Sequence, residues 1–335
     1  MTKDSSGLLL ISLLFLIVPR FSFAEQQNST QISGRRVEEI LLGDSSKSIS
    51  QLPLYAALRS GFFEQEGLTL KNVSMRGELM AAAFASGDLH YSGITGSMSR
   101  FAATGGPVKV VAVCVMRPPS FLMANRSIRN LQELRGKSLA VNSIGQLADL
   151  SMRAFLRKNG LNPEKDLRIT SITSNQARAQ AVETGGVAAG LFSIPLNAVL
   201  KQSGLVELGF TGDSIPPQGI SGLTVSDQVL RDRPAQLRKF LRAYVRGLQI
   251  TWTKKAETVA ILTREFNVQP SIGESALNSF YQIATRNGLV PDAAFEDALE
   301  FAKKSANRNA TISDVRDFGP LMEVLKELNI PASIQ

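Results

Sequence analysis

Residues 51–98, QLPLYAALRSGFFEQEGLTLKNVSMRGELMAAAFASGDLHYSGITGSM, decide the fold of this chain. Their apolar spacing alternates between the helical and the strand period. The pattern predicts two helix–strand pairs and, after a Gly/Ser turn, a further helix: 53–61, 68–73, 77–86, 89–92 and 98–104. A strand that leads through such a turn into a helix N-terminus is an arrangement that holds an anionic or strongly polar small molecule.

A second α/β series follows, and it contains the same arrangement of strand, Gly/Ser turn and helix N-terminus. Strand 138–141 leads through the turn Asn142-Ser143-Ile144-Gly145-Gln146 into a helix over 147–158. Further strands at 167–172, 187–192 and 205–210 alternate with helices. The alternation predicts an α/β fold whose mainly parallel sheets are covered on both faces. The remainder is predicted to be largely helical, with an amphipathic helix over 234–253.

Two proline-rich segments divide this pattern. Pro118-Pro119 and Pro216-Pro217 lie about 100 residues apart, each between two apolar strand patterns. Stiff segments of this kind predict two crossings of the chain between separate lobes. A chain of 335 residues is long enough for about two domains.

Composition and charge narrow the class of protein. The chain is 44% hydrophobic and 20% charged, which is ordinary for a globular protein, and its net charge is +8. Lysine and arginine are scattered, and the densest basic run, 231–246, has apolar positions interleaved at helical spacing. We interpret that run as the solvated face of a helix, with a partner-docking patch as the alternative. Because no aromatic-plus-basic pattern appears, we expect no nucleic-acid partner.

The chain has one cysteine, Cys114, and one histidine, His90. A disulfide within the chain is therefore impossible, and a zinc site built from histidine and cysteine would lack ligands. We expect Cys114 to be a buried core thiol and His90 to be a structural or surface residue. The sequence predicts no metal, no cofactor and no catalytic residue, since no nucleophile–base pair is recognisable.

The N-terminus resembles a secretory signal peptide over residues 1–24. An apolar run of 11 residues, 8–18, is too short to span a bilayer, and Ser22-Phe23-Ala24 places small residues at the expected cleavage site. We expect cleavage after Ala24, a flexible lead-in over 25–36 and a periplasmic location. A retained N-terminal anchor is the alternative; a lipid-anchored form is not expected, because no cysteine follows the apolar run.

Several short motifs together resemble a known family, the periplasmic substrate-binding proteins of nitrate, sulfonate, taurine and pyrimidine-precursor ABC importers (the NMT1/THI5-like group). The motifs, in order, are PLYAA (53–57), GFFEQEGL (61–68), SGD (86–88), GPVKVV (106–111), LQELRGK (131–137), GLNPEKD (160–166) and the segment 234–247. The resemblance covers residues 37–265. One departure is Gly186-Val187-Ala188, where the family usually has an acidic residue after the glycine–valine pair. The related cytosolic thiamine-pyrimidine synthases need a cysteine-rich iron motif, which this chain lacks.

The resemblance implies a type II periplasmic-binding-protein fold with the ligand between two lobes. Lobe I is expected over 37–117 plus 219–335 and lobe II over 118–218. It also implies that the protein is not an enzyme: it captures a small polar or anionic solute, of the sulfonate, nitrate, carboxylate or pyrimidine class, for an inner-membrane ABC permease and ATPase complex. We expect a monomer. A sensor-input protein for a membrane receptor and a secreted hydrolase are the alternatives.

The candidate ligand-binding residues lie at the turns that end strands, where open α/β sheets bind ligands. They are Ser48, Ser50, Gln51, Arg76, Gly77, Glu78, Thr95, Gly96, Ser97, Asn142, Ser143, Gly145, Gln146, Arg178 and Ser193. Each has a simpler interpretation: serine and glycine as helix caps, Arg76 and Arg178 as ion-pair residues. Glu78 disfavours an anion beside it and is more compatible with a ligand that carries an amine or a ring N–H.

Overall fold

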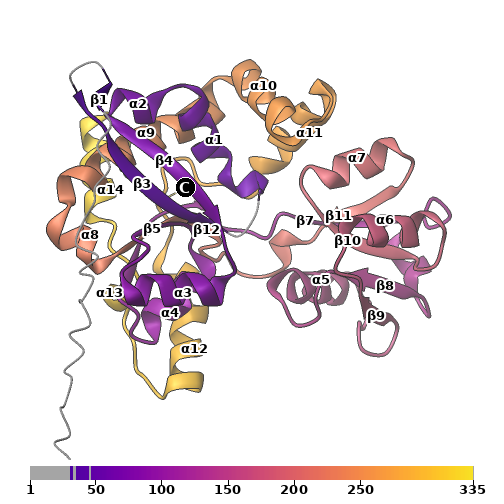
Figure 1. Ribbon diagram of the computed structural model, residues 1–335. Coiled ribbons are helices and arrows are strands. Elements are labelled where there is room, and N and C mark those ends of the chain that lie inside the picture. Colours follow the sequence, from indigo (N-terminus) through magenta and orange to yellow (C-terminus); the bar gives the residue numbers. More distant parts are fainter. Residues whose placement is uncertain (1–30, 33–34, 45–46, 335) are drawn as a thin grey trace, which may run out of the picture.

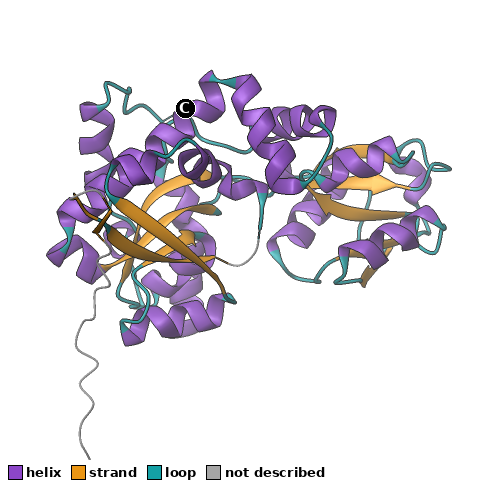
Figure 2. Cartoon of the chain, turned by 45° about the horizontal axis from the view of Figure 1, so that its top comes forward, coloured by secondary structure: helices purple, strands orange, loops and turns teal. Residues whose placement is uncertain are grey.

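The computed structural model describes residues 31–32, 35–44 and 47–334 of the chain. Two five-stranded sheets, each covered by helices, lie side by side (Figures 1 and 2). The predicted signal peptide and most of the predicted lead-in lie outside the described residues. Within the described part, no helix has both the length and the apolar character that a membrane crossing requires.

The first sheet has the strand order β4-β3-β5-β12-β6. The strands β1 and β2, which precede it in the sequence, pair with each other as a separate two-stranded sheet. The strands are β1 (Gln31–Ile32), β2 (Arg35–Arg36), β3 (Glu38–Asp44), β4 (Leu68–Ser74), β5 (Tyr91–Ile94), β6 (Val108–Val115) and β12 (Ser221–Ser226). The N-terminal helices that accompany them are η1 (Ile49–Gln51), α1 (Leu52–Arg59), α2 (Phe62–Gln65), α3 (Gly77–Ser86) and α4 (Gly96–Ala103). The C-terminal ones are α8 (Asp227–Asp232), α9 (Pro234–Thr253), α10 (Lys255–Phe266), α11 (Pro270–Phe280), η4 (Asp292–Phe295), α12 (Glu296–Ala306), α13 (Ile312–Val315) and α14 (Gly319–Glu327).

The second sheet has the order β11-β7-β10-β8-β9. Its strands are β7 (Ser120–Ala124), β8 (Ser138–Val141), β9 (Arg168–Ser171), β10 (Ala189–Ser193) and β11 (Val206–Phe210). Its helices are η2 (Leu131–Leu134), α5 (Leu147–Lys158), α6 (Asn175–Glu183), α7 (Leu196–Gln202) and η3 (Gly212–Ser214). The predicted α/β fold is thus confirmed, but both sheets are mixed and not mainly parallel, since half of the strand pairings are antiparallel.

One strand in each sheet runs against its neighbours. β12 pairs antiparallel with β5 and β6, and β7 pairs antiparallel with β10 and β11. Each of these two strands is the first one after the chain has passed from the other sheet. The linking segments are residues 116–119 and 211–220, which contain the two predicted Pro-Pro crossings. The assignment of 37–117 plus 219–335 and of 118–218 as separate lobes stays a prediction, and we use the names lobe I and lobe II for these segments.

Arg117 is one of the contacts that connect the two linking segments, beside the backbone hydrogen bond from Gln218 N to the carbonyl of Met116 at 2.8 Å. Arg117 Nε lies 3.1 Å from Asp213 Oδ1. Its Nη1 also donates to the carbonyl of Gln282, just after α11, at 3.0 Å. Arg117 therefore joins the first crossing to the second crossing and to lobe I.

The long helix α9 covers one face of the first sheet. Its apolar side packs Phe240 against Phe63 and Tyr91, with ring centroids 5.0 and 5.2 Å apart. Gly247 lets α1 approach closely, since a Cβ there would lie 2.2 Å from the carbonyl oxygen of Pro53. Arg238, Lys239 and Arg242 of the basic run form ion pairs within the chain, for example Arg242 with Glu66 at 2.9 Å.

Glu265 of α10 binds the last residue of α1 and a lysine that precedes η1. This carboxylate lies 3.1 Å from Lys47 Nζ and accepts from Arg59 Nε at 2.7 Å. Burial raises its pKa, but the hydrogen bonds and charges of Arg59 and Lys47 outweigh burial, and the net pKa is lowered from its ordinary value of 4.5. A lowered folded-state pKa means that the ion pairs stabilise the fold above the unfolded-state pKa and lose this effect as the pH falls through the folded-state value.

We expect Glu265→Gln to reduce the free energy of unfolding at pH 7 by about 1 kcal/mol. The difference from the wild type should shrink as the pH falls below 4.5, the ordinary pKa of this group. Urea unfolding of both proteins at a series of pH values measures this. A difference that stays constant down to pH 3 would show that the Glu265 ion pairs do not act as described.

Candidate functional site

A pocket of about 290 Å³ lies between the two sheets. It is lined by residues from the helices that accompany each of the two sheets and from the second linking segment. The lining comprises Gly96, Ser97, Ser99, Arg100, Gly145, Gln146, Leu147, Leu150, Gln218, Gly219, Ile220, Ala294, Asp297 and Ala298. The two predicted Gly/Ser turns, one from each sheet, thus meet at one cavity, which we call the interlobe pocket.

The first wall is the N-terminus of α4. The helix begins at Gly96, two residues before the predicted start, because the N–H groups of Thr95 and Gly96 both donate to the carbonyl of Ile220 at 3.3 Å. Thr95 is the N-cap, but its side chain does not cap the helix. Its Oγ1 is buried and has no hydrogen-bond partner in the described part of the chain. First-turn N–H groups have no intrahelical acceptors, so this helix end can donate to a ligand.

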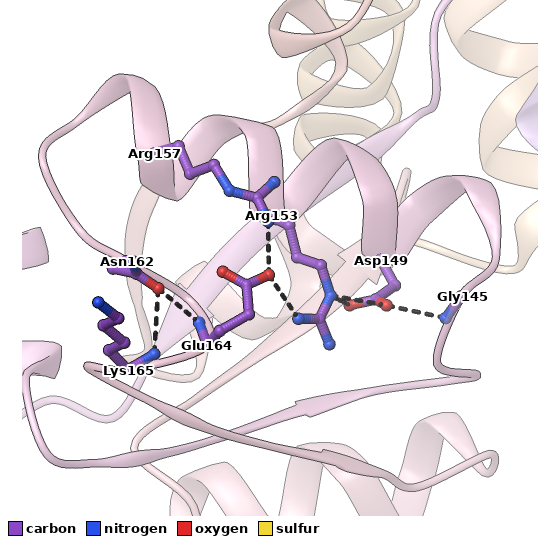
Figure 3. A network of polar contacts seen from close by, with 7 residues as sticks. All are labelled: Gly145, Asp149, Arg153, Arg157, Asn162, Glu164 and Lys165. Carbon is purple, nitrogen blue, oxygen red and sulfur yellow. Dashed lines mark hydrogen bonds and ion pairs between the residues drawn. The ribbon is translucent and has the colours of Figure 1, made fainter.

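The second wall is the N-terminus of α5, where the Gln146 side chain also leaves the helix uncapped. Gly145 has φ +81°, a conformation that favours glycine. Its N–H donates to Asp149 Oδ2 at 2.8 Å, and Asp149 also binds Arg153 Nε at 3.0 Å (Figure 3). Arg153 in turn lies 3.3 Å from Glu164. The fully buried Asp149 therefore fixes the turn, and its place in the first helical turn is the signal by which the sequence could have revealed it.

The third wall combines charged and apolar groups from α4 and α12. Arg100 lies 2.7 Å from Asp297, and its guanidinium lies 5.4 Å from the ring centre of Phe301. Leu147, Leu150, Ile220 and two alanines supply the apolar lining. The site can therefore offer backbone N–H groups, hydroxyls and amides to a polar group, and methyl and methylene groups to an apolar body.

Comparison with known proteins bears on this arrangement. Residues 48–257 match the family model described as NMT1/THI5 like. The chain belongs to the NMT1/THI5-like family. The predicted resemblance is thus confirmed.

Individual relatives of this family member are distant. The riboflavin-binding protein RibY of Chloroflexus aurantiacus is 23% identical over 236 residues, which cover 69% of this chain and 66% of RibY, just under two thirds of its length. The periplasmic sulfonate-binding protein SsuA of Methylobacillus flagellatus KT matches with a TM-score of 0.69 at 17% identity, over 89% of this chain and 98% of SsuA. The desulfurization enzyme DSZB matches with a TM-score of 0.65 at 15% identity, over 86% and 99% of the two chains. These likenesses confirm the periplasmic-binding-protein fold.

In this NMT1/THI5-like chain, four candidate residues line the interlobe pocket: Gly96, Ser97, Gly145 and Gln146. Thr95 lies directly behind them as the N-cap of α4. Arg76, Gly77 and Glu78 start α3 at the edge of this region, where an added Cβ on Gly77 would lie 3.3 Å from Ser97 Oγ. The side chains of Arg76 and Glu78 are exposed and are not among the lining residues.

The candidates before α1 support the fold beneath the turn. Gln51 is buried, and its Nε2 donates to the carbonyl of Gly93 at 3.2 Å. The carbonyl of Ser50 accepts from Ser221 Oγ at 3.2 Å and from Cys114 Sγ at 3.3 Å. Ser48 is the N-cap of η1. Cys114 is a buried core thiol as expected, and burial raises its pKa to about 11.

The remaining candidates of lobe II lie outside the lining. Asn142 and Ser143 precede Gly145 in the turn, and the carbonyl of Asn142 accepts from Ser171 Oγ at 2.9 Å. Ser193 ends β10 opposite Ser120 and is exposed. The sequence reasoning missed Ser99, Arg100 and the lining residues from α5, the second crossing, η4 and α12. Only Gln218 and Gly219 carried a signal, since they belong to the Pro-rich crossing.

Arg178 is buried and bound to the protein itself. Nε donates to the carbonyl of Leu191 at 2.8 Å, Nη1 donates to the carbonyl of Ile172 at 2.6 Å, and Nη2 donates to Asn175. Its guanidinium lies 5.0 Å from the ring centre of Phe192, and burial lowers its pKa. These contacts connect α6 to the middle of β10 and to the residue that follows β9.

We expect Arg178→Met to destabilise the protein by about 3 kcal/mol, because the carbonyls of Leu191 and Ile172 lose a charged donor. Urea unfolding measures the loss, and ligand binding per folded molecule should stay unchanged. Loss of binding with unchanged stability would instead support the ligand-clamp role considered from the sequence.

Proposed function

We propose that this protein is an extracytoplasmic solute-binding protein of an ABC importer. It captures a small polar or anionic solute, of the sulfonate, nitrate, carboxylate or pyrimidine class, between two lobes. One observation carries the proposal: the uncapped N-termini of α4 and α5, from opposite sheets, line the same interlobe pocket. Helix N-termini favour anionic and strongly polar groups.

Lobe closure follows from the energies involved. An exposed helix N-terminus stabilises an anion by ~0.3–1 kcal/mol, or ~2 kcal/mol when partly buried. Micromolar binding requires about 8 kcal/mol, so two helix ends are insufficient. A hinge motion at residues 116–119 and 211–220 would exclude water and bury the ligand against Leu147 and Leu150.

The names of two similar proteins support a solute-binding role, since RibY binds riboflavin and SsuA binds sulfonate. Under this proposal the protein is periplasmic, is cleaved after Ala24, acts as a monomer and delivers its solute to a membrane permease and ATPase complex. The likeness to DSZB shows that the fold also serves an enzyme. The lining residues given above include neither cysteine nor histidine.

The test is a thermal-shift screen of protein stripped of ligand by unfolding and refolding. The compounds are taurine, alkylsulfonates, nitrate, aromatic carboxylates, pyrimidines and riboflavin. A true ligand at 100 times its Kd should raise Tm by about 4 °C. Small-angle scattering of the same sample should show a smaller radius of gyration.

A screen without any stabilising compound would refute the solute-binding proposal. Mass spectrometry of each stabilising compound after prolonged incubation separates binding from catalysis. Unchanged compound is expected, and a product would favour the enzyme alternative.

A further inference from the structure

The ion pair of Arg100 and Asp297 belongs to the wall of the interlobe pocket. Arg100 lies on α4, one helical turn from Gly96, and Asp297 lies in the first turn of α12. Arg100 Nη2 and Nε both contact Asp297 Oδ2, at 2.7 and 2.8 Å. The side chains remain 44% and 46% exposed, so the pair faces space that a ligand can enter.

These two residues determine the charge of the pocket. Every other lining residue is glycine, alanine, serine, glutamine, leucine or isoleucine, so Arg100 and Asp297 are the only lining residues with charged side chains. Both bonds from Arg100 go to Oδ2, and Asp297 Oδ1 accepts no hydrogen bond from the residues that the structure describes. The pocket therefore presents an available carboxylate oxygen close to two helix N-termini that attract negative charge.

A ligand that carries only an acid group does not fit this combination well. Asp297 repels the acid group, and it also holds the one cation that would otherwise bind the acid group. A ligand with an acid group and a protonated amine satisfies both parts, because its acid group meets the helix N-termini and Arg100 while its amine meets Asp297 Oδ1.

We propose that Asp297 is a specificity-determining residue and that it selects zwitterionic solutes, with a sulfonate or carboxylate at one end and an amine at the other. This inference rests on the proposed solute-binding function and assigns its ligand class. In a purely structural role, Asp297 would only stabilise the start of α12 and hold Arg100 in place.

The experiment compares two matched pairs of compounds by titration calorimetry at pH 7 on ligand-stripped protein. The pairs are propanesulfonate with 3-aminopropanesulfonate, and propanoate with 3-aminopropanoate. In at least one pair the amino compound should bind at least tenfold more tightly. Asp297→Asn should reverse this order, weakening the amino compound at least tenfold and strengthening the other one severalfold, because Arg100 is released.

Glu300→Gln is the matched control. Glu300 lies on the same helix, is exposed, pairs with Lys304 at 2.8 Å and does not line the pocket, so both affinities should stay at their wild-type values. The melting temperatures of the variants test whether they are folded. The comparison of the two compounds of each pair on the wild-type protein does not depend on any variant.

Equal affinity within both pairs, or preference for the compound without an amine, overturns the zwitterion assignment. The assignment is also overturned if Asp297→Asn changes the melting temperature but not the ratio of the two affinities. In that case the ion pair of Arg100 and Asp297 has only a structural role. If none of the four compounds binds but the broad screen finds another ligand, the assignment fails while the solute-binding function stands. Failure of the broad screen is the separate result that refutes the function.

Discussion

Ser97→Trp should abolish ligand binding and leave the protein folded. Ser97 is exposed in the first turn of α4 and lines the interlobe pocket. An indole at this position fills space that the ligand needs and covers first-turn N–H groups of the helix. We expect Kd for any ligand found in the screen to rise at least 100-fold, as measured by titration calorimetry.

The control for this substitution is Ser305→Trp. Ser305 is also an exposed helical serine, near the end of α12, and it is not among the lining residues. Both variants should melt within about 2 °C of the wild type, since neither adds bulk to the core. Wild-type affinity in Ser97→Trp would show that the ligand binds elsewhere.

Gly247→Val should strongly destabilise the protein. A Cβ at Gly247 would lie 2.2 Å from the carbonyl oxygen of Pro53 and 2.7 Å from both Cβ and N of Ala57. Because two of these atoms belong to the backbone of α1, the two helices would have to separate. We expect a loss of at least about 3 kcal/mol in the free energy of unfolding, measured by urea denaturation.

Ala260→Val is the matched control, because it places valine at an exposed position of the neighbouring helix α10. It should cost no more than about 0.7 kcal/mol, the difference in helix propensity. Equal losses in both variants would show that valine in a helix, and not the contact between α1 and α9, causes the effect.

Elements with strong local signals were predictable from the sequence. α9, α5 and β8 have their predicted bounds, because each has a clear apolar period or a clear start and stop. The start of α4 was not predictable in the same way. Its first turn is fixed by the carbonyl of Ile220, which the second crossing brings to Thr95 and Gly96 from more than 120 residues further along the chain.

The same distinction holds for the site. The turns at 95–97 and 142–146 were recognisable, since glycine and serine at a strand–helix junction have a local signature. Asp297 has no such signature, because only the packing of α12 against α4 brings it to the pocket. Arg178 and Gln51 differ from these turns, because the acceptors of their N–H groups include carbonyls of the chain itself. Their role as ligand contacts stays a prediction.

The position of β12 constrains the order in which a nascent chain can fold. This strand lies between β5 and β6, but it is synthesised after every strand of the second sheet. The emerging polypeptide can therefore complete its second sheet while β6 still lacks a hydrogen-bonded neighbour in the first. During that interval an unpaired strand edge is open to wrong partners, a hazard that a chaperone holding the growing chain would reduce. A circular permutant that begins at residue 219 would synthesise β12 before β5 and β6 and remove this delay.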